Sequence, residues 1–256
     1  MPLVQGWTKS ALLEVQEYVL MVGKVGRAAI TKPFYFRDIV EQFEAIGVGS
    51  LTVVLLTGMF TGLVLALQSG LTLDQFGARS MVGRLVSASM VKELGPVLTG
   101  LMVAGRVGSG IAAELGSMVV TEQIAALRAL GTDPIRKLVL PRMLAGFCMV
   151  PLLTVVSGGV GMVGAWIVTV TQLKVPSSVY WNSVVAGLYI QDVWMGLIKP
   201  FFIGFTIASI GCHVGMRTYG GTQGVGRSTT NAVVAASVAV IAVDFLVTKL
   251  LIALMY

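Results

Sequence analysis

Hydrophobic residues in this chain are gathered into five long runs, separated by shorter polar segments. A transmembrane helix needs about 20 mostly apolar residues to cross the hydrocarbon core of a bilayer. Each run meets that length. The pattern therefore predicts five transmembrane helices, over residues 48–69, 84–115, 138–171, 193–213 and 230–254.

The second and third runs are longer than one membrane crossing requires. At 1.5 Å per residue, a helix over 84–115 would be about 48 Å long, against a hydrocarbon core of about 30 Å. We expect both helices to tilt, or to project toward the polar segment 121–142 that lies between them.

Residues 8–34 have a different pattern. Apolar positions such as Leu12 and Val19 are interrupted by charged ones such as Glu14 and Lys24. This segment is too polar for a typical span, and it predicts an amphipathic helix lying in the membrane interface. The alternative is a first transmembrane span with poor hydropathy.

Composition confirms the class. Hydrophobic residues make up 55% of the 256 residues and charged residues only 12%, with a mean hydropathy of +0.87. A soluble domain has about 25% charged residues. We therefore expect an all-α integral membrane protein with one domain over 1–256. The net charge of +6 does not indicate nucleic-acid binding, because the basic residues flank the apolar runs.

The basic residues also predict the orientation, since they are enriched on the cytoplasmic side of membrane proteins. They place the N-terminus, the segment 121–142 and the loop before the fifth run in the cytoplasm. Five spans then place the C-terminus outside, in the periplasm of a bacterial inner membrane. The cytoplasmic set is Lys9, Lys24, Arg27, Lys32, Arg37, Arg128, Arg136, Lys137, Arg142, Arg217 and Arg227, against Arg79, Arg84 and Lys174 on the other side.

Sites for metals and nucleotides are not predicted. Cys148 and Cys212 lie in apolar runs, and His213 has no other ligand at a suitable spacing. The glycines of 220–226 have no following Lys-Ser or Lys-Thr pair, so they predict a turn and not a phosphate loop. No cofactor is expected, and any ATPase would be a separate chain.

The segment 121–142 has the features of a short surface helix. Thr121 is a candidate N-cap, Gly131 a C-terminal stop, and Asp133-Pro134 would open the next helix. A rigid helix at one membrane face suits the transfer of force from a soluble partner, so 121–130 is a candidate coupling helix. The alternative is a capped interfacial loop without a partner.

Lys92, Glu93 and Pro96 lie inside the second run, in the sequence KELGP. Charged residues within a span are costly and usually face a cavity or a partner. Pro96 cannot donate to the carbonyl of Lys92, so we expect a kink and an exposed carbonyl beside the two charges. Arg106 lies about 40° from Lys92 around a regular helix, which predicts a polar track for an anionic amphiphile. The alternative is a structural ion pair.

Three further charged residues lie in the last two runs. Asp244 is in the middle of the fifth run, where it would pair with a cation on another helix or mark an ion path. Lys199 and Lys249 are predicted near outer helix ends, with their side chains extending to the interface.

These motifs resemble those of the MlaE (YrbE-type) permeases, the membrane subunits of ABC transporters that work with MCE proteins in bacterial lipid traffic. The resemblance covers nearly the whole chain and is densest from Val91 to Ala145. It is carried by KELGPVLTGLMVAGRVGSGIAAELG, TEQIAALRALGTDPIRKLVLPR and AVDFLVTKLL.

The resemblance implies a permease homodimer with an interfacial helix and five spans, which moves phospholipid and maintains outer-membrane lipid asymmetry. It implies a cytoplasmic ABC ATPase dimer, a periplasmic MCE hexamer and, in some bacteria, a STAS-domain protein. The candidate lipid cavity residues are Lys92, Glu93, Leu94, Pro96 and Arg106. The candidate ATPase-coupling residues are Glu122, Gln123, Ala126, Leu127, Leu130, Gly131, Asp133 and Pro134.

Two other functions fit the same residues. One is an ion-coupled secondary transporter that uses Lys92, Glu93 and Asp244 as a relay. The other is a membrane scaffold subunit without transport activity. The candidate coupling helix favours the permease, and no inverted repeat of the kind common in secondary transporters is found.

Overall fold

The computed structural model describes residues 2–31 and 35–255, and within residues 2–11 it describes the backbone only. The described chain is almost entirely helical and contains no strand. Five helices in it are long and apolar enough to cross a membrane, which confirms the predicted number. They are Phe36–Asp74, Arg79–Val120, Ile135–Thr171, Ile190–Met216 and Gly221–Met255.

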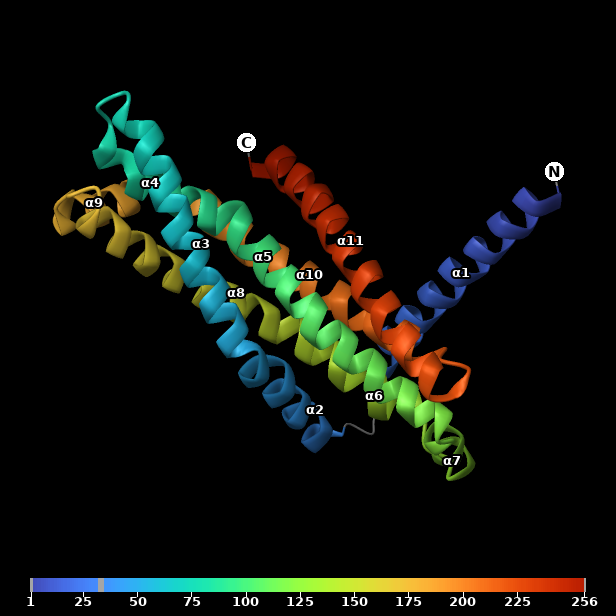
Figure 1. The fold of residues 1–256 in the computed structure, drawn as a ribbon. Helices are drawn as coiled ribbons and strands as arrows, with labels where there is room; N and C mark the ends of the chain where they lie inside the picture. Colours follow the sequence, from blue (N-terminus) through green and yellow to red (C-terminus); the bar gives the residue numbers. More distant parts are fainter. Residues whose placement is uncertain (1, 32–34, 256) are drawn as a thin grey trace.

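Several of these helices consist of consecutive segments (Figure 1). The first contains α2 (Phe36–Phe43), η1 (Glu44–Val48) and α3 (Gly49–Asp74). The second contains η2 (Arg79–Met81), α4 (Val82–Ser89), η3 (Met90–Leu94), α5 (Gly95–Val103), η4 (Ala104–Gly108) and α6 (Ser109–Val120). The remaining elements are α1 (Pro2–Ile30), α7 (Gln123–Ala129), η5 (Ile135–Val139), α8 (Leu140–Thr171), α9 (Ser177–Gly187), α10 (Ile190–Met216) and α11 (Gly221–Met255).

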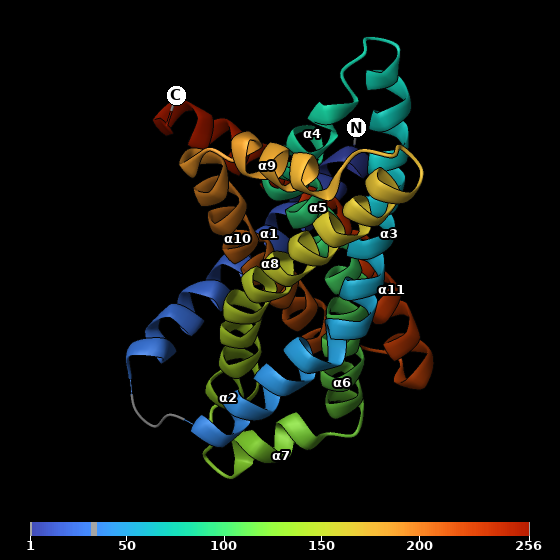
Figure 2. The same cartoon turned by 90° about the vertical axis from the view of Figure 1, so that its left-hand side faces the viewer.

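The second and third spans are over-long, as predicted. They comprise 42 and 37 residues and are joined through α7 at one end of the molecule. The turn between α10 and α11 lies at this same end, whereas α9 and the tip of α4 lie at the opposite end (Figures 1 and 2). Loops that the sequence places on opposite sides of a membrane are thus separated in space.

The predicted N-terminal helix is present as α1, and residues 32–34 of its predicted range lie outside the described residues. Its second half packs on η5, α8 and α10, where the Tyr18 hydroxyl is 2.7 Å from Ser209 Oγ and Glu17 pairs with Arg217 at 3.0 Å. Its first half extends away from the bundle (Figure 1). The placement of α1 in the membrane interface stays a prediction.

The helix α9 was not predicted, because its segment is short and not strongly apolar. It packs on α4, and its Tyr180 is fully buried with the hydroxyl donating to the Met162 carbonyl at 2.8 Å. Trp166 Nε1 donates to Ser177 Oγ at 2.8 Å. These contacts hold α9 across the end of α8.

The helices α3 and α8 pack closely against each other. A Cβ atom at Gly58 would lie 2.6 Å from the Ser157 carbonyl oxygen, and one at Gly62 would overlap the Gly161 carbonyl. Small residues allow helix backbones to approach in this way within a membrane. Gly58, Gly62 and Gly161 therefore serve helix packing within the chain.

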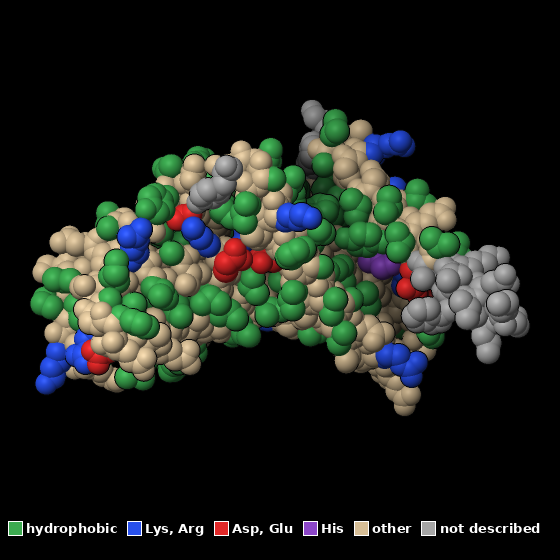
Figure 3. Space-filling view, turned by 90° about the horizontal axis from the view of Figure 1, so that it is seen from above, with side chains coloured by type: hydrophobic (Ala, Val, Ile, Leu, Met, Phe, Trp, Pro, Cys, Tyr) green, Lys and Arg blue, Asp and Glu red, His purple; other side chains and the backbone are tan. Residues whose placement is uncertain are grey.

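The outer surface of the bundle is strongly apolar. Large exposed side chains line α3 and α11, for example Phe60, Val64, Val238 and Phe245. Charged groups are sparse on the face shown in Figure 3, where acidic and basic side chains lie side by side in the central part. So much exposed apolar area is typical of a surface that contacts lipid or another membrane protein.

Candidate functional site

Five charged residues from three helices form a cluster within the bundle, here called the central charge cluster: Lys92, Glu93, Asp192, Lys199 and Asp244. Lys92 Nζ lies 2.7 Å from Asp192 Oδ1, and Lys199 Nζ lies 2.8 Å from Glu93 Oε2 and 3.5 Å from Asp244 Oδ1. Lys92 and Glu93 come from η3, Asp192 and Lys199 from α10, and Asp244 from α11. The cluster therefore joins the second, fourth and fifth spans.

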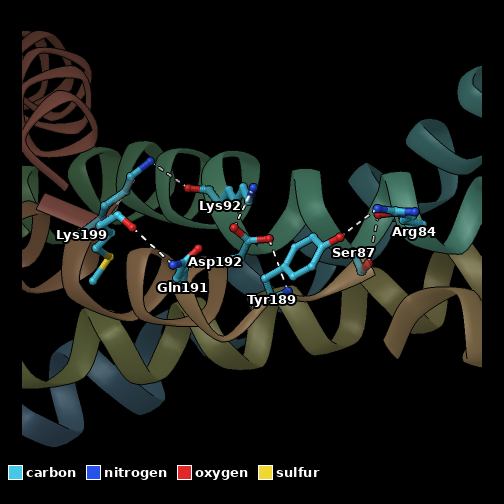
Figure 4. Close-up of polar contacts among 8 residues, drawn as sticks. Arg84, Ser87, Lys92, Tyr189, Gln191, Asp192 and Lys199 are labelled. Atoms are coloured by element: carbon cyan, nitrogen blue, oxygen red, sulfur yellow. Dashed lines mark hydrogen bonds and ion pairs between the residues drawn. The ribbon is translucent and has the colours of Figure 1, made fainter. Parts of the chain in front are cut away.

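Proline chemistry explains why the cluster forms at η3. Pro96 has no N–H to offer the Lys92 carbonyl, so that oxygen is open to another donor. Lys199 Nζ donates to it at 2.8 Å (Figure 4). The exposed carbonyl predicted beside the charged pair is confirmed, and its partner is a lysine from another helix.

The prediction that the Lys199 side chain extends to the interface is wrong. Its side chain is fully buried and is shared by two carboxylates and one carbonyl. The reason is that α10 begins at Ile190, so Lys199 lies more than two turns inside this helix, facing η3 and α11. Lys249 differs, because it lies exposed on α11.

Lys92 and Glu93 were expected to act together as neighbours, but they have separate cross-helix partners. Asp192, the partner of Lys92, was not singled out in the sequence because it is a single carboxylate in the first turn of α10. Its side chain is 1% exposed and also accepts the Tyr189 N–H at 3.4 Å. The Tyr189 hydroxyl in turn accepts a hydrogen bond from Arg84 at 3.1 Å, which extends the polar contacts along α4 (Figure 4).

Burial divides the central charge cluster into two parts. Asp192, Lys199 and Asp244 are buried, whereas the Lys92 side chain is 33% exposed and that of Glu93 is 45% exposed. Removing one member of a buried ion pair typically destabilises a protein by about 3–5 kcal/mol, because the other charge loses its compensation. The buried residues therefore fix the positions of two charged groups that reach the surface of the bundle.

An apolar groove lies beside these exposed charges. It has a volume of about 370 Å³ and is lined by Leu94 together with α3 residues Phe60, Thr61, Val64, Leu65 and Gln68. Leu94 directly follows Glu93 in η3, so the groove begins one residue from the half-exposed charges, which do not themselves line it. An elongated apolar ligand with a polar end could be held by such a pair of features.

The other two predicted cavity residues lie apart from the groove. Pro96 is buried within the helix. Arg106 lies on η4, where its Nη1 donates to the Ala45 carbonyl at 3.1 Å and to Ser50 Oγ at 2.9 Å. The structure therefore places Arg106 at the junction of η1 and α3, away from the central charge cluster.

The predicted coupling helix is present as α7, with shorter bounds. Thr121 was expected to cap it, but this is wrong. The Thr121 hydroxyl donates back to the Ser117 carbonyl at 2.8 Å, at the end of α6. The chain then turns sharply at Glu122, whose φ of 62° is left-handed, and α7 begins at Gln123.

The end of α7 matches the sequence prediction. Gly131 has a φ of 75°, its N–H donates to the Arg128 carbonyl at 3.0 Å, and the Thr132 N–H donates to the Leu127 carbonyl at 3.0 Å. This pair of bonds is the Schellman motif, which favours glycine. Asp133 Oδ1 then accepts the Ile135 N–H at 3.0 Å and so caps the next helix.

The side chains of α7 point in two directions. Ile124 is buried and Leu127 is half-buried, and both pack against the main core. Leu130 is 81% exposed, and Glu122, Gln123 and Ala126 are exposed as well. The helix is thus fixed to the bundle on one face and presents a small, partly apolar surface on the other.

Comparison with known proteins agrees with this architecture. The chain matches the family Permease MlaE over residues 39–250. It is 44% identical over 227 residues to a probable ABC transporter permease protein of Rickettsia bellii, covering 87% of this chain and 88% of the relative. It is 34% identical over 235 residues to the intermembrane phospholipid transport system permease protein MlaE of Haemophilus influenzae, covering 91% of this chain and 89% of the relative.

A more distant relative is found in a plant. The chain is 34% identical over 230 residues to the chloroplastic protein TRIGALACTOSYLDIACYLGLYCEROL 1 of Arabidopsis thaliana, covering 90% of this chain and 66% of the relative. The family match spans most of the helical bundle, including η3 and α7. The chain therefore belongs to the MlaE permease family and is a multi-pass membrane subunit of a transporter rather than an enzyme.

Proposed function

We propose that this chain is the permease of an ABC transporter that moves phospholipid between the inner membrane and a periplasmic MCE partner. In this way it would maintain the lipid asymmetry of the outer membrane. The observation that carries the proposal is the apolar groove lined by Leu94 and α3, next to the half-exposed Lys92 and Glu93. The name of the Haemophilus influenzae relative supports phospholipid as the substrate class.

The groove and the charges suit the two parts of a phospholipid. Acyl chains would lie against Phe60, Val64 and Leu94, and the head group would lie near Lys92 and Glu93. A lysine offers phosphate a single point charge rather than a two-pronged contact. Because Lys92 is also held by Asp192, its position is fixed before the lipid arrives.

We infer that two copies of the chain form the transport unit. The exposed apolar faces of α3 and α11 flank the helix that carries η3 and α5, while α8 and α10 lie behind it (Figure 1). A second copy covering these faces would enclose the groove and close it to the surrounding lipid. An MCE hexamer would receive the lipid on the periplasmic side, and in some bacteria a STAS-domain protein would join the complex.

Energy would enter through α7. An ABC ATPase dimer would dock on its exposed face, and ATP binding would move the two α7 helices as the ATPases close. Because α7 joins the second and third spans directly, its motion would reach η3 and the groove. Narrowing of the groove would then expel the lipid toward the periplasmic partner.

Membership in a family of ABC permeases favours this function over an ion-coupled carrier or a scaffold. The carboxylates Glu93 and Asp244 are both engaged by Lys199, which suits a fixed structural role. Transport that depends on a proton gradient and not on ATP would reverse this order of preference.

The proposal is tested by replacing Glu93 with alanine in the reconstituted complex. Losing a charged hydrogen-bonding group costs roughly 1.5–3 kcal/mol, so we expect phospholipid transport by Glu93→Ala to fall by about tenfold or more. Transport is measured as the ATP-dependent transfer of labelled phospholipid to the MCE partner.

The matched control is Glu41→Ala, since Glu41 is an exposed carboxylate on α2 that pairs only with its helical neighbour Arg37 in the described structure. Transport by both variants is expressed per assembled complex, because Glu93 also pairs with the buried Lys199 and its loss can lower the amount of folded permease. Normal transport by Glu93→Ala at normal abundance would remove the groove from the lipid path.

A further inference from the structure

A second cavity lies at the end of the bundle that carries α7, between α1 and the segment that follows α7. Its volume is about 480 Å³. Four basic side chains and one carboxylate line it, together with a small apolar floor. The lining residues are Lys24, Arg27, Ala28, Arg128, Asp133, Pro134, Ile135 and Arg136.

The charge of this cavity is strongly unbalanced. Its carboxylate, Asp133, already accepts the Ile135 N–H and lies 3.6 Å from Arg136 Nε. Within the described residues, Lys24, Arg27 and Arg128 form no ion pair with a carboxylate. Three solvent-exposed cations therefore line one cavity without an ion-pair partner among the described residues, and their combined positive potential favours the entry of an anion.

The position of the cavity indicates an amphiphile rather than a small soluble anion. Lys24 and Arg27 lie near the end of α1, directly after a stretch whose exposed side chains include Leu13, Val19 and Leu20. Basic pockets at the cytoplasmic side of transmembrane helices bind anionic lipid head groups. An acyl chain could lie along α1 while the phosphate enters the cavity.

We propose that this cavity binds the head group of an anionic phospholipid from the cytoplasmic leaflet, as a structural lipid distinct from the transported one. The lipid would connect α1, α7 and η5, because one phosphate would be shared by cations from all three elements. It would thereby stabilise the position of α7, the segment on which the ATPase would act. The proposal rests on the proposed cytoplasmic placement of α7 and not on phospholipid transport.

The test uses the full-length permease, purified alone, in nanodiscs of phosphatidylcholine with or without phosphatidylglycerol. We expect phosphatidylglycerol to raise the thermal unfolding midpoint and to remain bound in native mass spectrometry. Lys24→Gln combined with Arg27→Gln should weaken retention of phosphatidylglycerol by about tenfold or more, because two of the cavity's cations are lost.

The matched control is Arg37→Gln combined with Arg227→Gln, which removes two exposed cations from the same side but outside the cavity. It should keep both the retained lipid and the shift in midpoint. The unfolding midpoint of each variant with phosphatidylglycerol is compared with that of the same variant in phosphatidylcholine alone, which separates lipid binding from a loss of folding. Arg128→Gln gives a second variant, with a single cation of the cavity removed.

Three outcomes would overturn the proposal. In the first, both double variants lose phosphatidylglycerol equally, which would indicate general attraction to the membrane surface. In the second, inorganic phosphate at equal ionic strength stabilises the protein in phosphatidylcholine as much as phosphatidylglycerol does, which would indicate a site for a soluble anion. In the third, the Lys24→Gln and Arg27→Gln double variant retains phosphatidylglycerol as well as the intact chain does, which would show that the lipid is held elsewhere. Because no transport is measured, these outcomes do not depend on the proposed function.

Discussion

At the scale of single residues, Lys199 and Pro96 determine the geometry of the central charge cluster. Pro96 withholds a backbone donor from the Lys92 carbonyl, and Lys199 supplies one from α10. The same ammonium lies beside Glu93 and Asp244. One lysine thus donates to a backbone oxygen, pairs closely with Glu93 and lies 3.5 Å from the Asp244 carboxylate on a third helix.

We expect Lys199→Met to lower the free energy of unfolding by about 3–5 kcal/mol, because Glu93 and Asp244 lose their common cation. Pro96→Ala restores an N–H that can reach the Lys92 carbonyl. In the double variant this N–H replaces the missing lysine at that oxygen. The double variant should therefore lose less stability than the sum of the single variants, by about 1 kcal/mol.

The measurement is a double-mutant cycle on the purified protein in one detergent, with unfolding followed by circular dichroism. Lys249→Met serves as the control, since Lys249 is an exposed lysine on α11. Strict additivity between positions 96 and 199 would show that the carbonyl contact contributes nothing to stability.

Hydropathy predicts some residues of the central charge cluster and not others. Lys92, Glu93 and Pro96 are conspicuous because charges and proline are rare within an apolar run. Asp192 was not singled out, and Lys199 was assigned to an outer helix end, because both lie near the predicted start of a span, where polar residues are common. Their importance depends on which helices pack together, and the periodicity of one helix carries no information about its neighbours.

At the scale of elements, the wide π-helical turns η3 and η4 explain the position of Arg106. The predicted angle of about 40° between Lys92 and Arg106 assumes a regular α-helix. Each π-turn holds about one residue more than an α-turn, and this offsets the following side chains by roughly 100°. Arg106 therefore contacts the η1–α3 junction instead of sharing a face with Lys92.

The residues at which helices end were easier to predict from the sequence than the residues that share one helix face. Gly131 and Asp133 act as expected because a Schellman motif and an Asp cap depend on local hydrogen bonds alone. Thr121 did not cap α7, because the left-handed turn at Glu122 moves the N-cap by one residue. From this start, Ile124 and Leu127 pack against the core, and such packing is a tertiary effect.

The exposed face of α7 leads to a prediction about docking. Leu130 is 81% exposed, so Leu130→Asp should leave the fold intact. Burial of one leucine contributes about 1.5–3 kcal/mol, and its replacement by a charge should weaken co-purification of the ABC ATPase by about tenfold or more. The measurement is a pull-down in mild detergent with quantification of the bound ATPase.

Phe76→Asp is the matched control, because Phe76 is 77% exposed at the opposite end of the molecule. Leu127→Asp would be a less informative variant, since Leu127 packs against the core and its loss would also disturb folding. Retention of the ATPase by Leu130→Asp would move the docking surface away from this face of α7.

At the scale of the whole molecule, the two ends of the bundle differ in charge and in the elements that they expose. The end with α7 carries Arg128, Arg136 and Arg217, whereas α9 and the α3–η2 connection lie at the other end. Five spans and the positive-inside tendency predict a cytoplasmic N-terminus and a periplasmic C-terminus. The number of spans follows from hydropathy, but the packing of α3 on α8 and of α9 on α4 does not.

This orientation predicts which sites a membrane-impermeant maleimide can reach. In a background with Cys148→Ala and Cys212→Ala, Phe76→Cys should be labelled in intact spheroplasts. Leu130→Cys should be labelled only after the membrane is permeabilised, although both side chains are similarly exposed. The reverse pattern, read by mass shift on a gel, would invert the topology.

The π-helical turns of the second span also have a consequence for comparing related chains. A single-residue deletion in a regular transmembrane helix twists one half against the other, but a deletion within η4 would let the chain close as an ordinary α-helix. Gly105 is suited to such a loss, since a Cβ at this position would meet no neighbouring atom. In an alignment of related chains, a one-residue gap at this point would then mark a chain whose helix is regular here. The residues before and after the gap would keep their positions on the helix surface, so the gap would not be a misalignment.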